Sequence, residues 1–399
     1  MLVIGLIKEG KSPADNRVAL TPSQCSWLSH NFADIKIIVQ SCPHRCFSDN
    51  DYIKAGVEVK ETINQCTLLM GIKEVLADNL INDKTYLFFS HTKKKQSYNQ
   101  LLFHAMMDKN ITLIDYECLE HDDGQRVIGF GFFAGIVGAH NGMMAYGKRT
   151  GLYELGRVYK VHDYRQLINT YFGIRLPNLK VAITGSGRVA HGILEIMNLL
   201  DIQEVEPDEY RNKQFDYPVY VHLKGNDLYR HATKATYSRD DFHLNASSYQ
   251  CLFDQYIPYT DILMNGIYWD RTGPRLFEWD DMKRSDFAIK TIADITDDRG
   301  GSIPCNLGDA TKEEPVYGVD KSSGARTDPY LFNSVDIMAL GNLPNELPRD
   351  ASRYFGEQLI KYVLDDIRKG VSPLIERATM LKDGKLTKGF DYLKEYAAH

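Results

Sequence analysis

Ionisable side chains follow several short apolar runs in the first third of the sequence. Lys8, Lys73, His91 and Glu117 each come at the end of such a run. A lysine whose pKa is lowered by burial and neighbouring cations can act with an imidazole, which titrates near neutrality, to move protons on and off a substrate. We therefore expect Lys73 and His91 to be the acid–base pair and Lys8 to bind substrate at the same site.

Two arginines fit the binding of an anionic substrate. Arg17 follows an acidic turn, and Arg126 stands just before a glycine-rich segment. A guanidinium group binds a carboxylate through two parallel hydrogen bonds. Together with the lysine and histidine above, the arginines predict a keto acid or amino acid substrate.

A glycine-rich turn in the middle of the chain predicts a dinucleotide-binding site. The branched apolar run 181–184 leads into the pattern G-x-G-x-x-A and then into a helix. In this pattern the first glycine makes the turn, the second lets the backbone approach a pyrophosphate, and the alanine allows close helix packing. The expected cofactor-binding residues are Gly185, Gly187, Arg188, Val189 and Ala190.

The choice between NAD and NADP stays open at this point. Glu204 and Glu206 stand about twenty residues after the first glycine, where an acid accepts the ribose hydroxyls of NAD. We take Glu206 as the candidate. Arg188, Arg211 and Lys213 are nearby cations that suit the 2′-phosphate of NADP.

The alternation of apolar runs and helix-length segments predicts an α/β fold. Strand-sized runs cover residues 2–7, 35–40, 67–73, 85–91 and 111–117, and then 180–184, 204–206, 260–265, 289–295 and 335–340. Such alternation indicates parallel, doubly wound sheets, whose ligands bind at the carboxyl ends of the strands. We expect two Rossmann-like lobes with a cleft between them.

The lobes are expected to be joined by the segment 128–150. Residues 346–399 read as helices with an apolar face and are expected to pack back on the first lobe. The predicted domains are thus a discontinuous substrate and catalytic domain of residues 1–130 plus 346–399, and a dinucleotide-binding domain of residues 131–345. The polar, tyrosine-rich segment 207–248 has no clear period and is expected to leave the second sheet.

One uncharged stretch has the length of a membrane helix. Residues 127–147 carry no formal charge, but they contain six glycines, His140 and Asn141. A buried helix whose glycines allow close packing against a sheet fits this composition better than a membrane span. We therefore expect no membrane association.

Composition excludes other classes of protein. The 399 residues include 47 basic and 53 acidic side chains, for a net charge of −6. Binding to a phosphate backbone requires a basic surface, so we do not expect the protein to bind nucleic acid. The first apolar run is too short for a signal peptide, and seven scattered cysteines fit a reducing compartment. We expect a cytoplasmic protein. Cys42, His44 and Cys46 lack a second ligand pair, so no metal site is expected.

Longer motifs resemble a known family. IGLIKEGKSPADNRVALTP resembles the N-terminus of the alanine dehydrogenase and transhydrogenase superfamily. TYLFFSHTKKKQSYNQLL, IADITDDRGGSI and NSVDIMALGNLPNELPRDASRYFGEQL are similar to the lysine-ketoglutarate reductase half of the bifunctional lysine-degrading enzyme. They also resemble, more distantly, the lysine-forming saccharopine dehydrogenases. No segment resembles the saccharopine-oxidising half of the bifunctional enzyme.

The resemblance implies a reaction and a set of residue roles. Lysine and 2-oxoglutarate would condense through an imine, which a nicotinamide reduces to saccharopine, or the reverse would occur. Lys73 and His91 would be the acid–base pair, Arg17 and Arg126 would bind carboxylates, and Glu117 would lie near the amine. Asp294 would face the nicotinamide region.

Other functions fit the same residues. An alanine-dehydrogenase-like enzyme would use free ammonia, another opine-type dehydrogenase would use a different amine, and a nucleotide-sensing protein would keep the fold without catalysis. The cofactor is NADP or NAD in the enzymatic cases. A homo-oligomer stays open.

Overall fold

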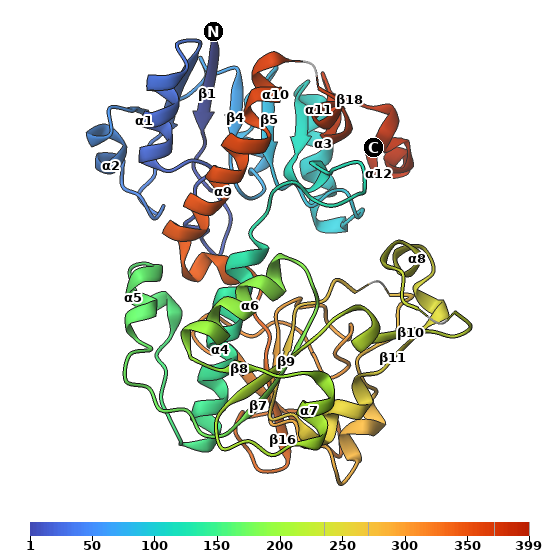
Figure 1. Ribbon diagram of the computed structural model, residues 1–399. Helices are drawn as coiled ribbons and strands as arrows, with labels where there is room; N and C mark the ends of the chain where they lie inside the picture. The colour runs from blue at the N-terminus through green and yellow to red at the C-terminus, as the bar shows by residue number, and fades with distance from the viewer. Residues whose placement is uncertain (235, 270, 371, 399) are drawn as a thin grey trace. The chain divides into compact units, whose positions relative to one another are not determined.

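The computed structural model describes residues 1–234, 236–269, 271–370 and 372–398. Its chain divides into two compact units (Figure 1). Unit 1 comprises Met1–Phe130 and Pro348–His399, and unit 2 comprises Gly131–Leu347. Each unit contains an eight-stranded, mostly parallel sheet with helices. The predicted α/β fold with two Rossmann-like lobes is confirmed.

The sheet of unit 1 has the order β18-β17-β6-β5-β4-β1-β2-β3. Strands β1 to β6 are parallel, whereas β17 is antiparallel to β6 and to β18. The strands are β1 (Leu2–Leu6), β2 (Ile35–Gln40), β3 (Glu58–Lys60), β4 (Leu68–Met70), β5 (Thr85–Phe88), β6 (Thr112–Asp115), β17 (Thr379–Lys382) and β18 (Lys385–Leu386).

Three of these strands end two or three residues earlier than the apolar runs predict. Each stops where the backbone turns away: β4 stops before Gly71, β5 stops before the segment in which His91 has a positive φ of 52°, and Asp115 ends β6 by accepting the Glu117 N–H. The ionisable side chains therefore lie in loops just past the strand ends. Such loops can present side chains to a ligand.

Helices of unit 1 come from both ends of the chain. They are α1 (Pro22–Asn31), α2 (Asp49–Lys54), α3 (Gln100–Asp108), α9 (Pro348–Tyr362), α10 (Leu364–Lys369), α11 (Pro373–Ala378) and α12 (Lys394–Ala397). Figure 1 shows α9, in red, among the blue N-terminal elements. Ser352 of α9 accepts the Val18 N–H (2.9 Å), and Phe355 stacks on Phe130 with ring centroids 4.5 Å apart. The tail thus packs on unit 1.

The apolar face of residues 346–399 predicted a wholly helical tail, but the structure shows that part of the tail is a β-hairpin. After α11 it forms the hairpin β17–β18, and β17 pairs with β6 at the edge of the sheet. Thr379 is β-branched, and the apolar Met380 and Leu381 lead into a Lys-Asp-Gly turn, in which Asp383 and Gly384 both have positive φ. This turn chemistry favours a hairpin, and edge pairing covers the open side of β6.

The sheet of unit 2 has the order β15-β14-β16-β13-β12-β7-β9-β8. Five neighbouring pairs from β16 to β8 are parallel, and β14 is antiparallel to β16 and β15. The strands are β7 (Lys180–Thr184), β8 (Gln203–Glu204), β9 (Val219–Leu223), β12 (Ile262–Asn265), β13 (Thr291–Asp294), β14 (Val316–Asp320), β15 (Arg326–Thr327) and β16 (Ser334–Met338).

The segment 207–248 differs from the expectation in one important way. It begins with α7 (Pro207–Asn212) and then returns to the sheet as β9, the direct neighbour of β7. Only the chain after β9 leaves the sheet, as α8 (Arg239–Leu244) and a small hairpin of β10 (Tyr229–His231) and β11 (Tyr249–Cys251). The apolar stretch VYVHL was hidden by its polar flanks.

The long helix α4 (Gly131–Thr150) is buried inside unit 2, as predicted. A Cβ on Gly135 would lie 2.1 Å from the Val189 carbonyl oxygen of α6 (Arg188–Leu199). A Cβ on Gly138 would collide with Ile295, which follows β13. The glycines therefore bring α4 against a second helix as well as against the sheet.

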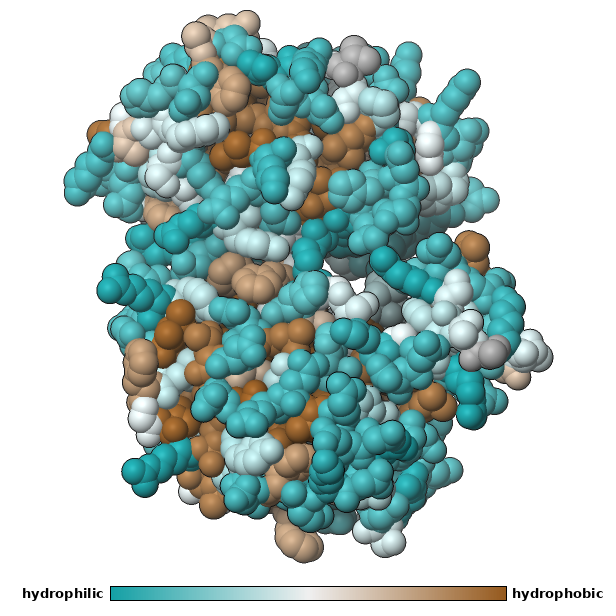
Figure 2. Space-filling view, in the orientation of Figure 1, coloured by the Kyte–Doolittle hydropathy of each residue, from teal (hydrophilic) through white to brown (hydrophobic). Residues whose placement is uncertain are grey.

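The hydropathy of the surface and the length and apolar character of the helices agree with a helix α4 that is buried in unit 2. On the face shown in Figure 2, most side chains are hydrophilic, with smaller groups of apolar ones between them. Among the described residues, none of the helices combines the length and apolar character that crossing a bilayer requires.

Candidate active site

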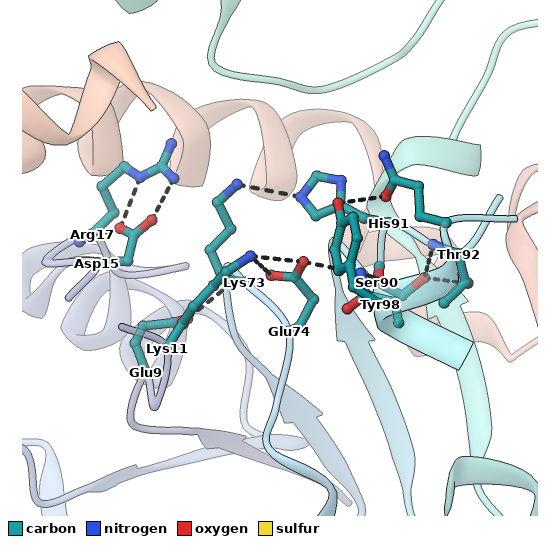
Figure 3. Close-up of polar contacts among 12 residues, drawn as sticks. Glu9, Lys11, Asp15, Arg17, Lys73, Glu74, Ser90, His91, Thr92 and Tyr98 are labelled. Carbon is teal, nitrogen blue, oxygen red and sulfur yellow. Dashed lines mark hydrogen bonds and ion pairs between the residues drawn. The ribbon is translucent and has the colours of Figure 1, made fainter. Parts of the chain in front are cut away.

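The loops after β1, β4, β5 and β6 carry the candidate catalytic side chains of unit 1. Because these strands are parallel and adjacent in the sheet, their carboxyl ends share one edge. Lys73 and His91 meet there, with 3.2 Å between Lys73 Nζ and His91 Nε2 (Figure 3). Both side chains are partly buried.

The environment lowers the pKa of both groups. Burial, followed by the charge of Arg17, lowers the Lys73 pKa below its usual value. Burial and the charge of Lys73 lower the His91 pKa to about 4. At neutral pH the imidazole is therefore uncharged, and its Nε2 accepts a hydrogen bond from the Lys73 ammonium. The pair combines an ammonium group that gives up its proton more readily than a free lysine with an uncharged imidazole.

Backbone strain supports a functional role for His91. Its φ of 52° lies in the left-handed region, where residues other than glycine are uncommon. The ring of His91 stacks on Phe89, with centroids 6.2 Å apart and an interplanar angle of 17°. Such strained conformations persist when surrounding contacts hold them, and they concentrate at active sites.

Glu9 fixes the backbone that carries Lys73. Its two carboxylate oxygens accept the N–H groups of Ile72 (2.6 Å) and Lys73 (2.9 Å). Burial and the nearby charge of Asp15 raise the Glu9 pKa to about 8. Sequence reasoning singled out the adjacent Lys8, which is exposed, and missed Glu9. The only signal was a second ionisable residue at the same strand end.

Glu74 is a second carboxylate beside the pair that sequence reasoning missed. Lys11 Nζ lies 2.9 Å from both of its oxygens (Figure 3). Asn99 Nδ2 donates to one of them at 3.1 Å. The side chain is buried, and its charge opposes the lowering of the pKa values of Lys73 and His91. Glu74 thus moderates the acidity of the pair.

Arg17 is held rigidly. Its Nε and Nη2 donate to the two oxygens of Asp15 at 3.0 and 2.6 Å, and its Cζ lies 4.2 Å from the centroid of the Phe130 ring. Both members of the ion pair are buried. A substrate carboxylate that binds Arg17 must therefore share the guanidinium with Asp15.

Arg126 forms an ion pair with Glu117, so two predicted substrate ligands contact each other. Glu117 is buried, whereas the Arg126 side chain is 44% exposed. The charge of Glu117 also acts on His91. The structure thereby connects the predicted carboxylate-binding residue, the predicted amine-binding residue and the acid–base pair.

The glycine-rich turn of unit 2 has the features of a phosphate cradle. Gly185 has a φ of 107°, and a Cβ there would lie 2.6 Å from the Gly266 carbonyl oxygen. A Cβ on Gly187 would meet nothing within 4 Å, so the space beside it is open. Gly187 precedes α6, whose N-terminus has no side-chain cap. Arg188, Val189 and the buried Ala190 begin this helix. These features fit a bound pyrophosphate.

Glu206 lies farther from this turn than the sequence suggested. The strand beside β7 is β9, and Glu206 follows β8, one strand beyond it. Lys224 therefore follows the strand that neighbours the turn. Asp294 is fully buried, with its oxygens bonded by Asn265, Thr296 and Asn306 at 2.8 Å. Its position near the nicotinamide stays a prediction.

Comparisons with known proteins agree with the geometry. A family model described as the N-terminal domain of alanine dehydrogenase/PNT matches residues 5–137. The mitochondrial alpha-aminoadipic semialdehyde synthase of Mus musculus is 29% identical over 449 residues, covering 98% of this chain and 48% of that protein. The NAD(+), L-lysine-forming saccharopine dehydrogenase of Yarrowia lipolytica is 23% identical, covering 93% of this chain and 94% of that protein. The chain is similar to both enzymes over more than nine-tenths of its length.

This result confirms the resemblance seen in the motifs. The chain spans about half the length of the semialdehyde synthases it matches. A solved L-alanine dehydrogenase has a TM-score of 0.68 at 16% identity and covers 99% of each chain, which shows that the two share a fold.

Proposed function

We propose that this chain is a nicotinamide-dependent oxidoreductase that interconverts lysine plus 2-oxoglutarate with saccharopine. The observation that carries the proposal is the 3.2 Å contact between Lys73 and His91, in which both pKa values are lowered. Homology to a lysine-forming saccharopine dehydrogenase supports the substrates.

The pair supplies the proton transfers that imine chemistry requires. Neutral His91 removes a proton from the lysine ammonium, so that the amine can attack the keto carbon. Lys73 donates a proton to the carbonyl oxygen as the carbinolamine forms, and the pair then helps water to leave. A nicotinamide cofactor held at the Gly185–Gly187 turn would provide the hydride for reduction of the resulting imine. The imine forms between the two substrates, so Lys73 forms no covalent bond.

Substrate carboxylates are proposed to bind Arg17 and Arg126, and Glu117 is proposed to receive the ammonium of the amine. Support comes from the ion pairs of these arginines with Asp15 and Glu117. Each guanidinium already binds a carboxylate of the protein, which is the geometry that a substrate carboxylate would use.

We infer that the cofactor is NADP(H). Lys224 is exposed and follows β9, at the place where an acid would bind the ribose of NAD. The other candidate cations, Arg211 and Lys213, lie in and just after α7, which follows β8 rather than β9, the neighbour of β7. Lys224, with Arg188 from the turn, is therefore the proposed partner of a 2′-phosphate.

The substrate assignment is tested by following the oxidation of NADPH with 2-oxoglutarate plus lysine, and in parallel with pyruvate plus ammonium. We expect turnover in the first mixture. Turnover in the second mixture alone would establish an alanine-dehydrogenase-like enzyme. Tight cofactor binding without turnover across a panel of amines would establish a nucleotide sensor.

The cofactor assignment is tested separately with Lys224→Ala. We expect kcat/KM for NADPH to fall about tenfold or more, the scale of a hydrogen bond to a charged group, while the value for NADH stays unchanged. Lys213→Ala, which removes a cation already paired on the surface, is the matched control. Equal losses for both cofactors would argue against the role of Lys224.

The compartment and assembly stay predictions. All seven cysteines are unpaired, as expected in a reducing environment, and we propose the cytoplasm. The mouse relative is mitochondrial by name. Small molecules are the proposed partners, and a homo-oligomer is still open.

A further inference from the structure

Strand β9 holds both backbone polar groups of Gly185, the first glycine of the phosphate-binding turn. The Gly185 N–H donates to the Leu223 carbonyl at 3.2 Å. The Gly185 carbonyl oxygen lies 2.6 Å from Nε2 of His222. A carbonyl oxygen only accepts, so His222 Nε2 carries the hydrogen and donates it. Gly185 is thus held through the two peptide units on either side of its Cα by two consecutive residues of the neighbouring strand.

Holding this carbonyl also orients the next N–H group. A peptide unit is planar and trans, so the Gly185 carbonyl and the Ser186 N–H point in opposite directions. When His222 draws the carbonyl toward β9, the Ser186 N–H points away from β9. Ser186 is exposed, and its N–H has no hydrogen-bond partner in the described part of the chain. The direction of this N–H group decides whether it can donate a hydrogen bond to a bound phosphate.

Gly185 needs such support because its conformation is unusual. Its φ of 107° is accessible to glycine but not to residues with a Cβ, which here would also strike the Gly266 carbonyl. Glycine lowers the strain at the cost of greater freedom of the unfolded and locally open chain. A side-chain hydrogen bond from outside the turn offsets this freedom.

We propose that His222 is a positioning residue for the cofactor: it locks the Gly185–Ser186 peptide so that the turn is preorganised for the pyrophosphate. The inference rests only on the dinucleotide-binding part of the proposed function. Lys224, two residues later, is assigned to the 2′-phosphate. The same strand therefore serves two different groups of the cofactor, and the two contributions are separable.

The test compares His222→Ala, His222→Gln and Tyr220→Phe by fluorescence titration with NADPH and with NADH. Tyr220 lies on the same strand but donates to Glu204, so it is the matched control. We expect His222→Ala to weaken both cofactors by the same factor, about tenfold. His222→Gln, whose amide nitrogen can donate to the same carbonyl, should recover most of the affinity.

Steady-state kinetics with lysine and 2-oxoglutarate provide a second readout. We expect His222→Ala to raise the KM for NADPH and to leave kcat at saturating NADPH unchanged. Lys224→Ala should instead change the ratio between the two cofactors. Where His222→Ala does not fold, His222→Asn replaces it, because asparagine is too short to keep the bond.

Three results would overturn the proposal. They are unchanged cofactor affinity in folded His222→Ala, a loss confined to NADPH, or no recovery in His222→Gln. Failure of the wild-type protein to bind either dinucleotide would instead overturn the proposed function. Binding without turnover would leave the role of His222 measurable by titration.

Discussion

The proposed acid–base pair, Lys73 and His91, can be tested one residue at a time. Lys73→Met and His91→Gln remove one member each and should lower kcat about 10²-fold or more, the usual contribution of acid–base catalysis. The dissociation constant for NADPH should stay the same, because the phosphate-binding turn belongs to unit 2. Stopped-flow turnover and cofactor titration measure the two quantities. Unchanged kcat in both variants would remove the pair from the mechanism.

The ion pair between Arg126 and Glu117 predicts that one substitution changes the affinities for the two substrates in opposite directions. Glu117→Gln removes the carboxylate that occupies Arg126, so the protein should bind 2-oxoglutarate more tightly in the presence of NADP⁺. The same change should weaken the binding of lysine, because the ammonium group of lysine loses its carboxylate partner. Isothermal titration measures both affinities. Glu120→Gln, which breaks the Lys93 pair, serves as the control, and weaker binding of both substrates would point to a general structural defect.

The close packing of α4 against α6 depends on glycines, which have no side chain at the contact. A Cβ on Gly192 would lie 2.0 Å from the Phe132 carbonyl oxygen of α4. Gly192→Ala should therefore force the two helices apart and lower the free energy of unfolding by more than about 2 kcal/mol. Gly156→Ala is the control, because a Cβ there meets nothing within 4 Å. Urea denaturation compares them, and equal stability of the two variants would contradict this packing.

His140 makes the stability of α4 depend on pH. Its ring nitrogens contact the Tyr171 hydroxyl (2.8 Å) and the Gly156 carbonyl (2.7 Å), and burial lowers its pKa from 6.5 to about 4. Between these values the unfolded chain binds the proton and the folded chain does not, so stability falls as pH drops from 6.5 toward 4. At about 1.4 kcal/mol per pKa unit, the loss approaches about 3 kcal/mol. His140→Gln should flatten this part of the profile of unfolding free energy against pH. An unchanged profile would assign the effect to other groups.

The elements also show where sequence reasoning succeeds and fails. The predicted strand 180–184 coincides with β7 because branched apolar residues fill a strand buried on both faces. β9 was missed because its five residues stand among polar and tyrosine-rich neighbours that carry no period. Missing β9 placed Glu206 beside the turn and hid His222 and Lys224. Glu9 and Glu74 were missed for another reason: their partners are backbone N–H groups and residues distant in sequence, which no local pattern encodes.

The discontinuity of unit 1 is tested by truncation after residue 347. This change removes β17, which covers the edge of β6, and Phe355, which packs on Phe89, Tyr116 and Phe130. Unit 1 should lose its cooperative unfolding transition and the protein its turnover. Unit 2 is one continuous segment, Gly131–Leu347, and should still bind NADPH. Loss of NADPH binding together with loss of turnover would show that the units depend on each other for folding.

The pairing of β17 with β6 has a consequence for the order in which the chain is made. A ribosome releases β1 to β6 first, then the whole of unit 2, and only afterwards the residues that complete the first sheet. At about 5–20 residues per second, the intervening residues of unit 2 take roughly 10–40 s to synthesise. During this interval the edge of β6 and the aromatic pocket for Phe355 lie uncovered on the nascent chain. Unit 2 can finish folding first, whereas unit 1 exposes an unpaired strand edge and apolar surface until its last residues are made.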